Sequence, residues 1–116
     1  MNDRLLSMLG ICKRAGQLIA GFDPVKKSVR CGRALLVLTA SDLSDRTKKE
    51  IAYLTRETEI PCLETARTLD EFEFALGRRA GVYCVEQEGF AKKLAALVQE
   101  EAARHPVCEN EEEPNL

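Results

Sequence analysis

The stretch from Gly21 to Gly32, GFDPVKKSVRCG, places an acid and a proline directly before a short run of positive charge. Lysine and arginine donate hydrogen bonds to phosphate oxygens without reading base sequence, and the start of a helix binds anions through its backbone N–H groups. The chemistry that this stretch offers is therefore the binding of a polyanion. Its basic members are Lys26, Lys27 and Arg30.

The order of residues predicts a helix that starts at Asp23. Aspartate is a strong N-cap residue, and Pro24 suits the first helical position, where its missing N–H costs nothing. Val25 and Val29 form a buried i, i+4 pair, which leaves the basic side chains mainly on the outer side. Gly21 lets the backbone turn sharply or approach a partner closely. A capped surface helix without a ligand is the alternative interpretation of these residues.

Residues for catalysis are scarce. The only histidine is His105, near the C-terminal end, and the carboxylates Glu71 and Glu73 fall on a charged helix face. A P-loop, a dinucleotide-binding glycine pattern and a zinc-protease motif are all missing from the sequence. We therefore predict that the protein is not an enzyme and needs no cofactor.

The five cysteines lack the C-x2-C spacing typical of zinc sites, so we expect no bound metal. An odd number of cysteines without a secretion signal indicates reduced thiols, which mostly serve as small buried hydrophobic residues. Cys31 and Cys108 are expected to be the exposed ones.

Charge is distributed unevenly along the chain. Residues 1–56 carry eleven Lys/Arg and five Asp/Glu, whereas residues 57–116 carry six and fourteen. Such a basic first half favours a polyanionic partner, although a solvated charged surface has the same composition. Most of the six aromatic residues occupy apolar positions expected in the core, which leaves no stacking platform for single strands. A structured RNA, contacted through its phosphates and groove edges, fits better.

The spacing of apolar residues alternates between helical and strand-like. Alternation of this kind favours an α/β protein, a three-layer α/β/α sandwich with a small mixed sheet of about four strands. Residues 1–104 should form one domain, followed by an acidic, disordered tail at 105–116. We expect helices over 2–16, 23–31, 45–59, 69–77 and 88–105, and strands over 17–22, 34–40, 60–66 and 81–86.

A family resemblance supports this interpretation. The segment LLSMLGICKRAGQLIAGFDPVKKSVRCGRALLVLTASD, from Leu5 to Asp42, resembles the kink-turn RNA-binding ribosomal protein superfamily of the archaeal "seven-Ae" type. It is most similar to the bacterial YlxQ-like branch, and the block LLSMLGICKRAGQLIAG is the most specific part. The resemblance implies an α/β/α fold and binding of kinked RNA helices without catalysis.

The family's RNA signature is Gly-x-Asn-Glu-x-x-Lys at the start of the second helix. Gly21 and Lys27 match this pattern, whereas Asp23 and Pro24 replace the Asn and Glu. An Ala-Glu-Asp sequence often follows the buried strand, and Asp42 matches its last residue.

The loop before the last strand also approaches RNA in this family. Its sequence here is GRRAG, so Arg78 and Arg79 stand where apolar residues are common.

Together these observations predict a cytoplasmic, monomeric RNA-binding protein that associates with ribosomes or translation and with no membrane. Its partner would be a structured RNA, a kink-turn or an rRNA-like element. A protein-interaction adaptor on the same fold, without RNA binding, is the alternative. The expected contact residues are Gly21, Asp23, Pro24, Lys26, Lys27, Arg30, Asp42, Arg78 and Arg79.

Overall fold

The computed structural model describes residues 3–104, so the predicted tail at 105–116, with Cys108, lies outside the described residues. Five helices and four strands alternate along this part of the chain, as the sequence predicts. The helices are α1 (Arg4–Arg14), α2 (Phe22–Arg30), α3 (Asp45–Thr58), α4 (Leu69–Leu76) and α5 (Glu88–Arg104). The strands are β1 (Leu18–Ala20), β2 (Leu36–Thr39), β3 (Cys62–Glu64) and β4 (Val82–Val85).

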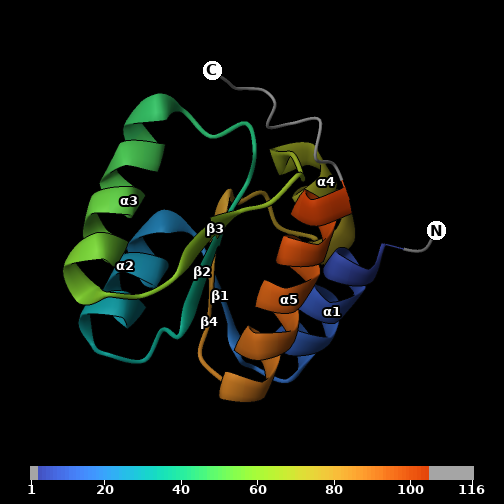
Figure 1. The fold of residues 1–116 in the computed structure, drawn as a ribbon, viewed down its shortest axis with the longest axis horizontal. Helices are drawn as coiled ribbons and strands as arrows, with labels where there is room; N and C mark the ends of the chain where they lie inside the picture. The colour runs from blue at the N-terminus through green and yellow to red at the C-terminus, as the bar shows by residue number, and fades with distance from the viewer. Residues whose placement is uncertain (1–2, 105–116) are drawn as a thin grey trace.

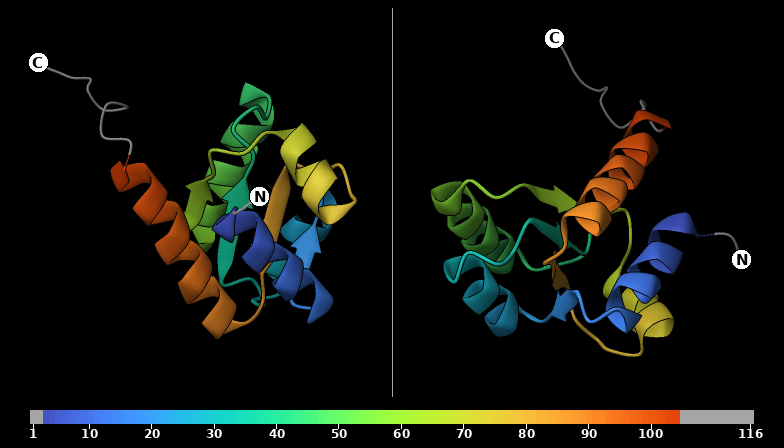
Figure 2. Two further views of the ribbon diagram at one scale, coloured as in Figure 1. Left: turned by 90° about the vertical axis from the view of Figure 1, so that its right-hand side faces the viewer. Right: turned by 90° about the horizontal axis from the view of Figure 1, so that it is seen from below.

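The strands form one mixed sheet in the order β1-β4-β2-β3. Strand β4 runs antiparallel to both of its neighbours, and β3 runs parallel to β2. Helices α2 and α3 cover one face of the sheet, and α1, α4 and α5 cover the other (Figures 1 and 2). The predicted α/β/α sandwich with a four-stranded mixed sheet is confirmed. No helix within residues 3–104 is long and apolar enough to cross a membrane.

Alternation of side chains along the central strands builds a core on each face of the sheet. Leu36 and Leu38 of β2 pack toward α1, α4 and α5, whereas Val37 packs toward α2 and α3. All four residues of β2 are buried, which confirms the strand expected from its continuous apolar run. Tyr83 contacts Phe72 of α4 with ring centroids 4.9 Å apart.

Thiol environments agree with the expected core role of the cysteines. Cys12 and Cys84 are fully buried, and burial raises the pKa of each thiol to about 11. Cys62 is half-buried, and burial also raises its pKa. Cys31 is exposed at the end of α2, as predicted.

Predicted helix starts are correct at α3 and α4. Ser44 accepts a hydrogen bond from the backbone N–H of Thr47 at 3.2 Å, and Thr68 forms a capping box with Glu71.

The start of α2 differs from the prediction. Helix α2 begins at Phe22, and its N-cap is Gly21, whose φ of 103° favours glycine. Asp23 is thus the second helical residue and makes no capping bond, and Pro24 is the third. The first helical hydrogen bond runs from the N–H of Val25 to the carbonyl of Gly21. Proline is tolerated at position 24 because a backbone N–H there would have no partner inside the helix. The N–H of Gly21 donates a hydrogen bond to the carbonyl of Val82, and the pairing of β1 with β4 ends at Gly21. The helix therefore starts directly after Gly21, earlier than predicted.

An ion-pair network joins three segments that are distant in the sequence. The guanidinium of Arg67 donates to Asp3 at 2.8 and 2.9 Å and to Glu101 at 2.6 and 3.0 Å. Asp3 also caps α1 by accepting the N–H of Leu6. The hydrogen bonds from Arg67 lower the pKa of Asp3 below its usual value. This network links the start of α1, the β3–α4 loop and the end of α5.

Two glycines give a matched test of packing. A Cβ added at Gly81 would lie 2.3 Å from Leu43 Cδ2, whereas one added at Gly10 in α1 meets no atom within 4 Å. We expect Gly81→Ala to destabilise the protein by about 1–3 kcal/mol through overpacking. Gly10→Ala should stabilise it by about 0.5–1 kcal/mol, since alanine favours the helix. Urea unfolding of both variants measures the difference, and similar effects of the two changes would contradict it.

Candidate nucleic-acid interface

The predicted segments meet at one end of the sheet. Strands β1 and β2 end where β4 begins, because both pair with it in antiparallel register, Ala20 opposite Tyr83 and Thr39 opposite Val82. The loops at 21, 40–44 and 77–81 therefore converge there, at the end of the sheet where the chain enters α3 in Figure 1. Backbone hydrogen bonds of 2.9 Å from Gly21 to Val82 and of 2.8 Å from Ala40 to Gly81 hold them together.

The loop that carries Arg78 is held from several sides. Gly77 ends α4 in the left-handed conformation, with φ of 74°. Lys13 Nζ donates a hydrogen bond to the carbonyl of Leu76, and the Tyr83 hydroxyl donates to the carbonyl of Arg78 at 3.4 Å. Burial raises the pKa of Tyr83 to about 12, so this hydroxyl stays a donor at neutral pH. The backbone of Arg78 is anchored while its side chain is exposed.

Cationic groups surround a small hollow beside Gly21. Lys13, Pro24 and Arg78 line a space of about 290 Å³, whose floor comes from β1 and Tyr83. The Arg78 guanidinium lies against Gly21, since a Cβ there would come within 3.4 Å of its Nη2. Neither Lys13 nor Arg78 forms an ion pair with any carboxylate in the described part of the chain. Their charges are available to an anion.

The start of α2 lies beside this hollow, which Pro24 lines. The first N–H groups of a helix have no partner inside the helix. Within residues 3–104 no side chain caps those of α2, which come from Phe22 and Asp23 because Pro24 has none. Because Asp23 does not occupy them, they are free for a phosphate. Lys27 follows Pro24 by three residues and shares its side of the helix. We call the set formed by Lys13, Gly21, Pro24, Lys27 and Arg78 the sheet-end surface.

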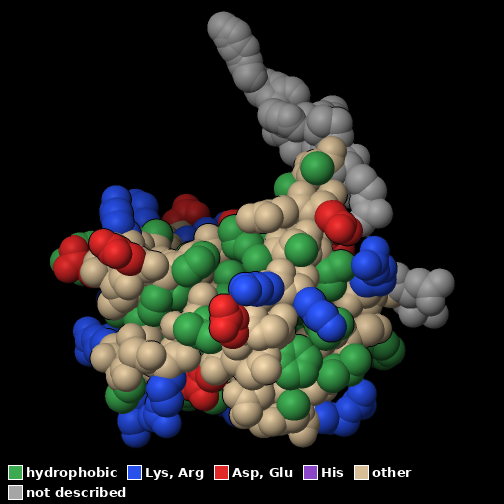
Figure 3. All heavy atoms as spheres, turned by 60° about the horizontal axis from the view of Figure 1, so that its bottom comes forward, with side chains coloured by type: hydrophobic (Ala, Val, Ile, Leu, Met, Phe, Trp, Pro, Cys, Tyr) green, Lys and Arg blue, Asp and Glu red, His purple; other side chains and the backbone are tan. Residues whose placement is uncertain are grey.

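Lys26 and Arg30 are not part of the sheet-end surface. They line a groove of about 340 Å³ between α2 and α3, together with Tyr53 and Glu57. Lys26 Nζ lies 5.8 Å from the centre of the Phe22 ring. The basic outer side of α2 is thus divided between two surfaces. Figure 3 shows acidic and basic side chains interspersed, with no extended region of one sign on the face it presents.

Asp42 and Arg79 have structural partners. Asp42 Oδ1 accepts the backbone N–H of Leu69 at 2.9 Å, which ties the β2–α3 loop to the start of α4. Arg79 donates to Asp70 at 2.5 Å and to Glu73 at 3.1 Å, and these bonds raise its pKa. The sequence predicts the same role for the adjacent residues Arg78 and Arg79. In the structure Arg79 is held by carboxylates, so it is less available to RNA than Arg78.

Sequence analysis missed Lys13 as a member of the site. Its position in the last turn of α1 is visible in the sequence, within the block LLSMLGICKRAGQLIAG. Its proximity to Arg78 depends on α1 and α4 lying on the same face of the sheet, which local patterns do not specify.

Comparisons with known proteins agree with this architecture. Residues 3–95 match the family described as "Ribosomal protein L7Ae/L30e/S12e/Gadd45 family". The RNA-binding protein YlxQ of Enterococcus faecium is 30% identical over 98 residues, which cover 84% of this chain and 94% of that protein. The RNA-binding protein YlxQ of Bacillus subtilis (strain 168) is 33% identical over 96 residues, 78% of this chain and 91% of that protein.

Solved structures show the same fold. A protein of unknown function from Bacillus halodurans C superimposes with a TM-score of 0.79 and 33% identity, covering 84% of this chain and 99% of that one. The Giardia lamblia 15.5kD RNA binding protein gives a TM-score of 0.63 at 16% identity, over 94% and 93% of the two chains. The match over residues 3–95 and the identity to both YlxQ proteins show that this chain belongs to the L7Ae/L30e/S12e/Gadd45 ribosomal protein family.

Proposed function

We propose that this protein binds structured RNA, without catalysis, through the sheet-end surface. The observation that carries the proposal is the guanidinium of Arg78, which has no ion pair within residues 3–104 and is held against Gly21 beside the start of α2. Membership of the family and the RNA-binding names of both YlxQ relatives support it. Arginine and a helix start are both suited to phosphate oxygens.

The geometry suits an RNA whose backbone changes direction. Lys27 on α2 and Arg78 on the α4–β4 loop present cations from two separate elements, and Lys13 at the end of α1 lines the same hollow as Arg78. A bent RNA brings phosphates of two helical arms near each other, so that both elements can be engaged at once. We therefore propose a kink-turn or a related rRNA-like element as the partner, and a place in the cytoplasm with ribosomes or translation.

The residues at the helix start limit base recognition. An ionised Asp23 accepts hydrogen bonds but cannot donate them, and Pro24 has neither a backbone N–H nor a polar side chain. Both residues are exposed and free of capping bonds, so they can be replaced without loss of a cap. We infer that the surface binds phosphates well and reads bases weakly.

The experiment is a titration of the parent and of the Asp23→Asn/Pro24→Glu variant with a kink-turn RNA and with a straight duplex. The parent should bind both RNAs, with a modest preference for the kink-turn. The variant regains an amide and a carboxylate, so the ratio of the two affinities should rise at least tenfold, about 1.4 kcal/mol.

One result would count against this function, and another would count against the weak reading of bases. A parent that binds neither RNA at 50 mM salt leaves the adaptor without RNA binding as the better interpretation. A parent that already discriminates strongly, with no gain in the variant, shows that Asp23 and Pro24 are compatible with base recognition.

A further inference from the structure

The groove between α2 and α3 carries positive charge on one side and negative charge on the other. Helix α2 contributes Lys26 and Arg30 to this groove, and α3 contributes Glu50 and Glu57. The volume of about 340 Å³ is at the lower end of the range for ligand sites. None of these four side chains forms an ion pair with another residue within residues 3–104. Their charges therefore remain available to a ligand.

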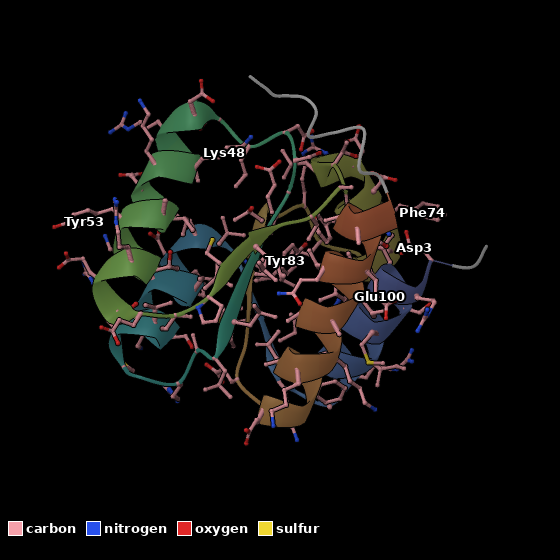
Figure 4. The ribbon with its side chains drawn as sticks, viewed as in Figure 1. Asp3, Lys48, Tyr53, Phe74, Tyr83 and Glu100 are labelled. Carbon is pink, nitrogen blue, oxygen red and sulfur yellow. The ribbon has the colours of Figure 1, made fainter. Side chains whose placement is uncertain are left out.

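An aromatic side chain lies between the two carboxylates of the groove. Tyr53 follows Glu50 by three residues and precedes Glu57 by four, so the three residues share one side of α3. Tyr53 is 61% exposed, and Figure 4 shows it at the outer edge of α3, on the side opposite Phe74. The ring is thus outside the core, and the flat face of any nucleobase can stack on it.

The two charged sides of the groove match the two ends of a nucleotide. A phosphate is an anion, which suits Lys26 and Arg30, one helical turn apart on α2. A base carries amino groups that donate hydrogen bonds, and the carboxylates of Glu50 and Glu57 can accept them. A nucleotide that lies across the groove therefore places its phosphate at α2 and its base at α3, against the ring of Tyr53.

The carboxylates on α3 favour an unpaired nucleotide over a duplex. Both strands of a duplex carry phosphates, so a duplex across the groove would bring phosphates close to Glu50 and Glu57, which repel them. The bases of a duplex are also stacked on each other, whereas an unpaired base is free to stack on an aromatic side chain. A single unpaired nucleotide satisfies both sides of the groove at once.

We propose that the α2–α3 groove binds one unpaired nucleotide of the same RNA, next to the structured element at the sheet-end surface. This inference rests on the proposed function. Lys27 of the sheet-end surface is adjacent to Lys26 of the groove, so α2 links the two surfaces. The preferred base is adenine or cytosine, whose amino group donates to Glu50 or Glu57. Uracil presents a carbonyl oxygen in place of this amino group and binds less well.

Fluorescence anisotropy of the full chain tests the inference with a blunt kink-turn RNA and with RNAs that carry three added adenosines at each strand end in turn. At least one extension should raise the affinity at least fivefold over that for the blunt RNA. Tyr53→Ala should remove this gain and leave binding of the blunt RNA unchanged, whereas Tyr53→Phe keeps the ring and should keep the gain. Phe74→Ala is the matched control, because Phe74 is 93% exposed on the opposite side and should also keep the gain.

The blunt RNA separates this inference from the proposed function. A parent that binds the blunt kink-turn and gains nothing from any extension overturns the inference and leaves the proposed function intact. Equal effects of Tyr53→Ala and Phe74→Ala on the gain would also overturn the inference. A parent that binds none of these RNAs would overturn both.

Replacement of the carboxylates tests base recognition independently. For the parent, three uridines at the same strand end should give at least threefold lower affinity than three adenosines. Glu50→Gln combined with Glu57→Gln keeps the side-chain lengths and adds amide donors for the uracil carbonyl, so this difference should disappear. Circular dichroism checks that the variants remain folded. An unchanged preference for adenosine in the double variant would overturn the placement of the base beside α3.

Discussion

Replacing Lys27 and Arg78 together by alanine is expected to lower RNA affinity about 100-fold near 0.1 M salt, which corresponds to about 2.7 kcal/mol. The two cations lie on different elements and contact different phosphates in the proposed complex, so their effects should add. Each lost phosphate contact also removes a released counterion and flattens the log–log dependence of affinity on salt by roughly 0.7–0.9. Fluorescence anisotropy between 50 and 300 mM salt measures both quantities.

Arg79→Ala is the matched control for this prediction. Arg79 is adjacent to Arg78 in the same loop and is also exposed, but its guanidinium is held by Asp70 and Glu73. Its removal should change RNA affinity less than twofold and leave the salt dependence almost unaltered. If Arg78→Ala and Arg79→Ala weaken binding equally, the sheet-end surface is not the contact, and general attraction by the basic half of the chain explains the affinity.

The contrast between these two arginines shows where prediction from the sequence ends. Apolar periodicity correctly predicts the elements, because burial of a face every 3.6 or 2 residues follows directly from helix and strand geometry. The partners of Arg79 are likewise local, six and nine residues away. The position of Arg78 beside Gly21 depends on the antiparallel pairing of β1 with β4, which brings the α4–β4 loop next to the end of β1. That pairing is a long-range property that no local pattern specifies.

The start of α2 shows a second limit. Asp-Pro is a strong local signal for a cap followed by the first helical residue, and the structure nevertheless begins the helix at Phe22. Tertiary pairing decides the outcome, because the N–H of Gly21 bonds to Val82 and fixes where the chain leaves the sheet. The family signature includes Gly21, but the sequence could not reveal that Gly21 is the N-cap of α2 or that no side chain within residues 3–104 caps this helix. The sequence also could not show that Lys26 and Arg30 lie on a different surface from Lys27, because this depends on the position of α3.

Loss of the Arg67 network should have the largest effect on stability. Arg67→Met keeps the length of the side chain but leaves Asp3 and Glu101, which are only 23% and 20% exposed, without their shared cation. Removing one partner of a fully buried pair costs about 3–5 kcal/mol, so a cost of about 2–3 kcal/mol is expected at this partly buried site. Arg4→Met is the control, because Arg4 pairs with Glu100 at 3.7 Å with both side chains more than half exposed. That change should cost less than about 0.5 kcal/mol in urea unfolding at pH 7.

The same network should make the free energy of unfolding depend on pH. The pKa of Asp3 in the folded protein lies below its value near 3.9 in the unfolded chain, because Arg67 donates hydrogen bonds to the ionised form. The folded state therefore binds fewer protons at this site, and its stabilisation is complete above about pH 5 and is lost as the pH falls through the folded pKa. In Arg67→Met this contribution is already missing, so the difference in unfolding free energy between parent and variant should shrink steadily below about pH 4. A difference that stays constant from pH 7 to pH 3 would show that Arg67 stabilises the fold through packing of its side chain and not through the charge of Asp3.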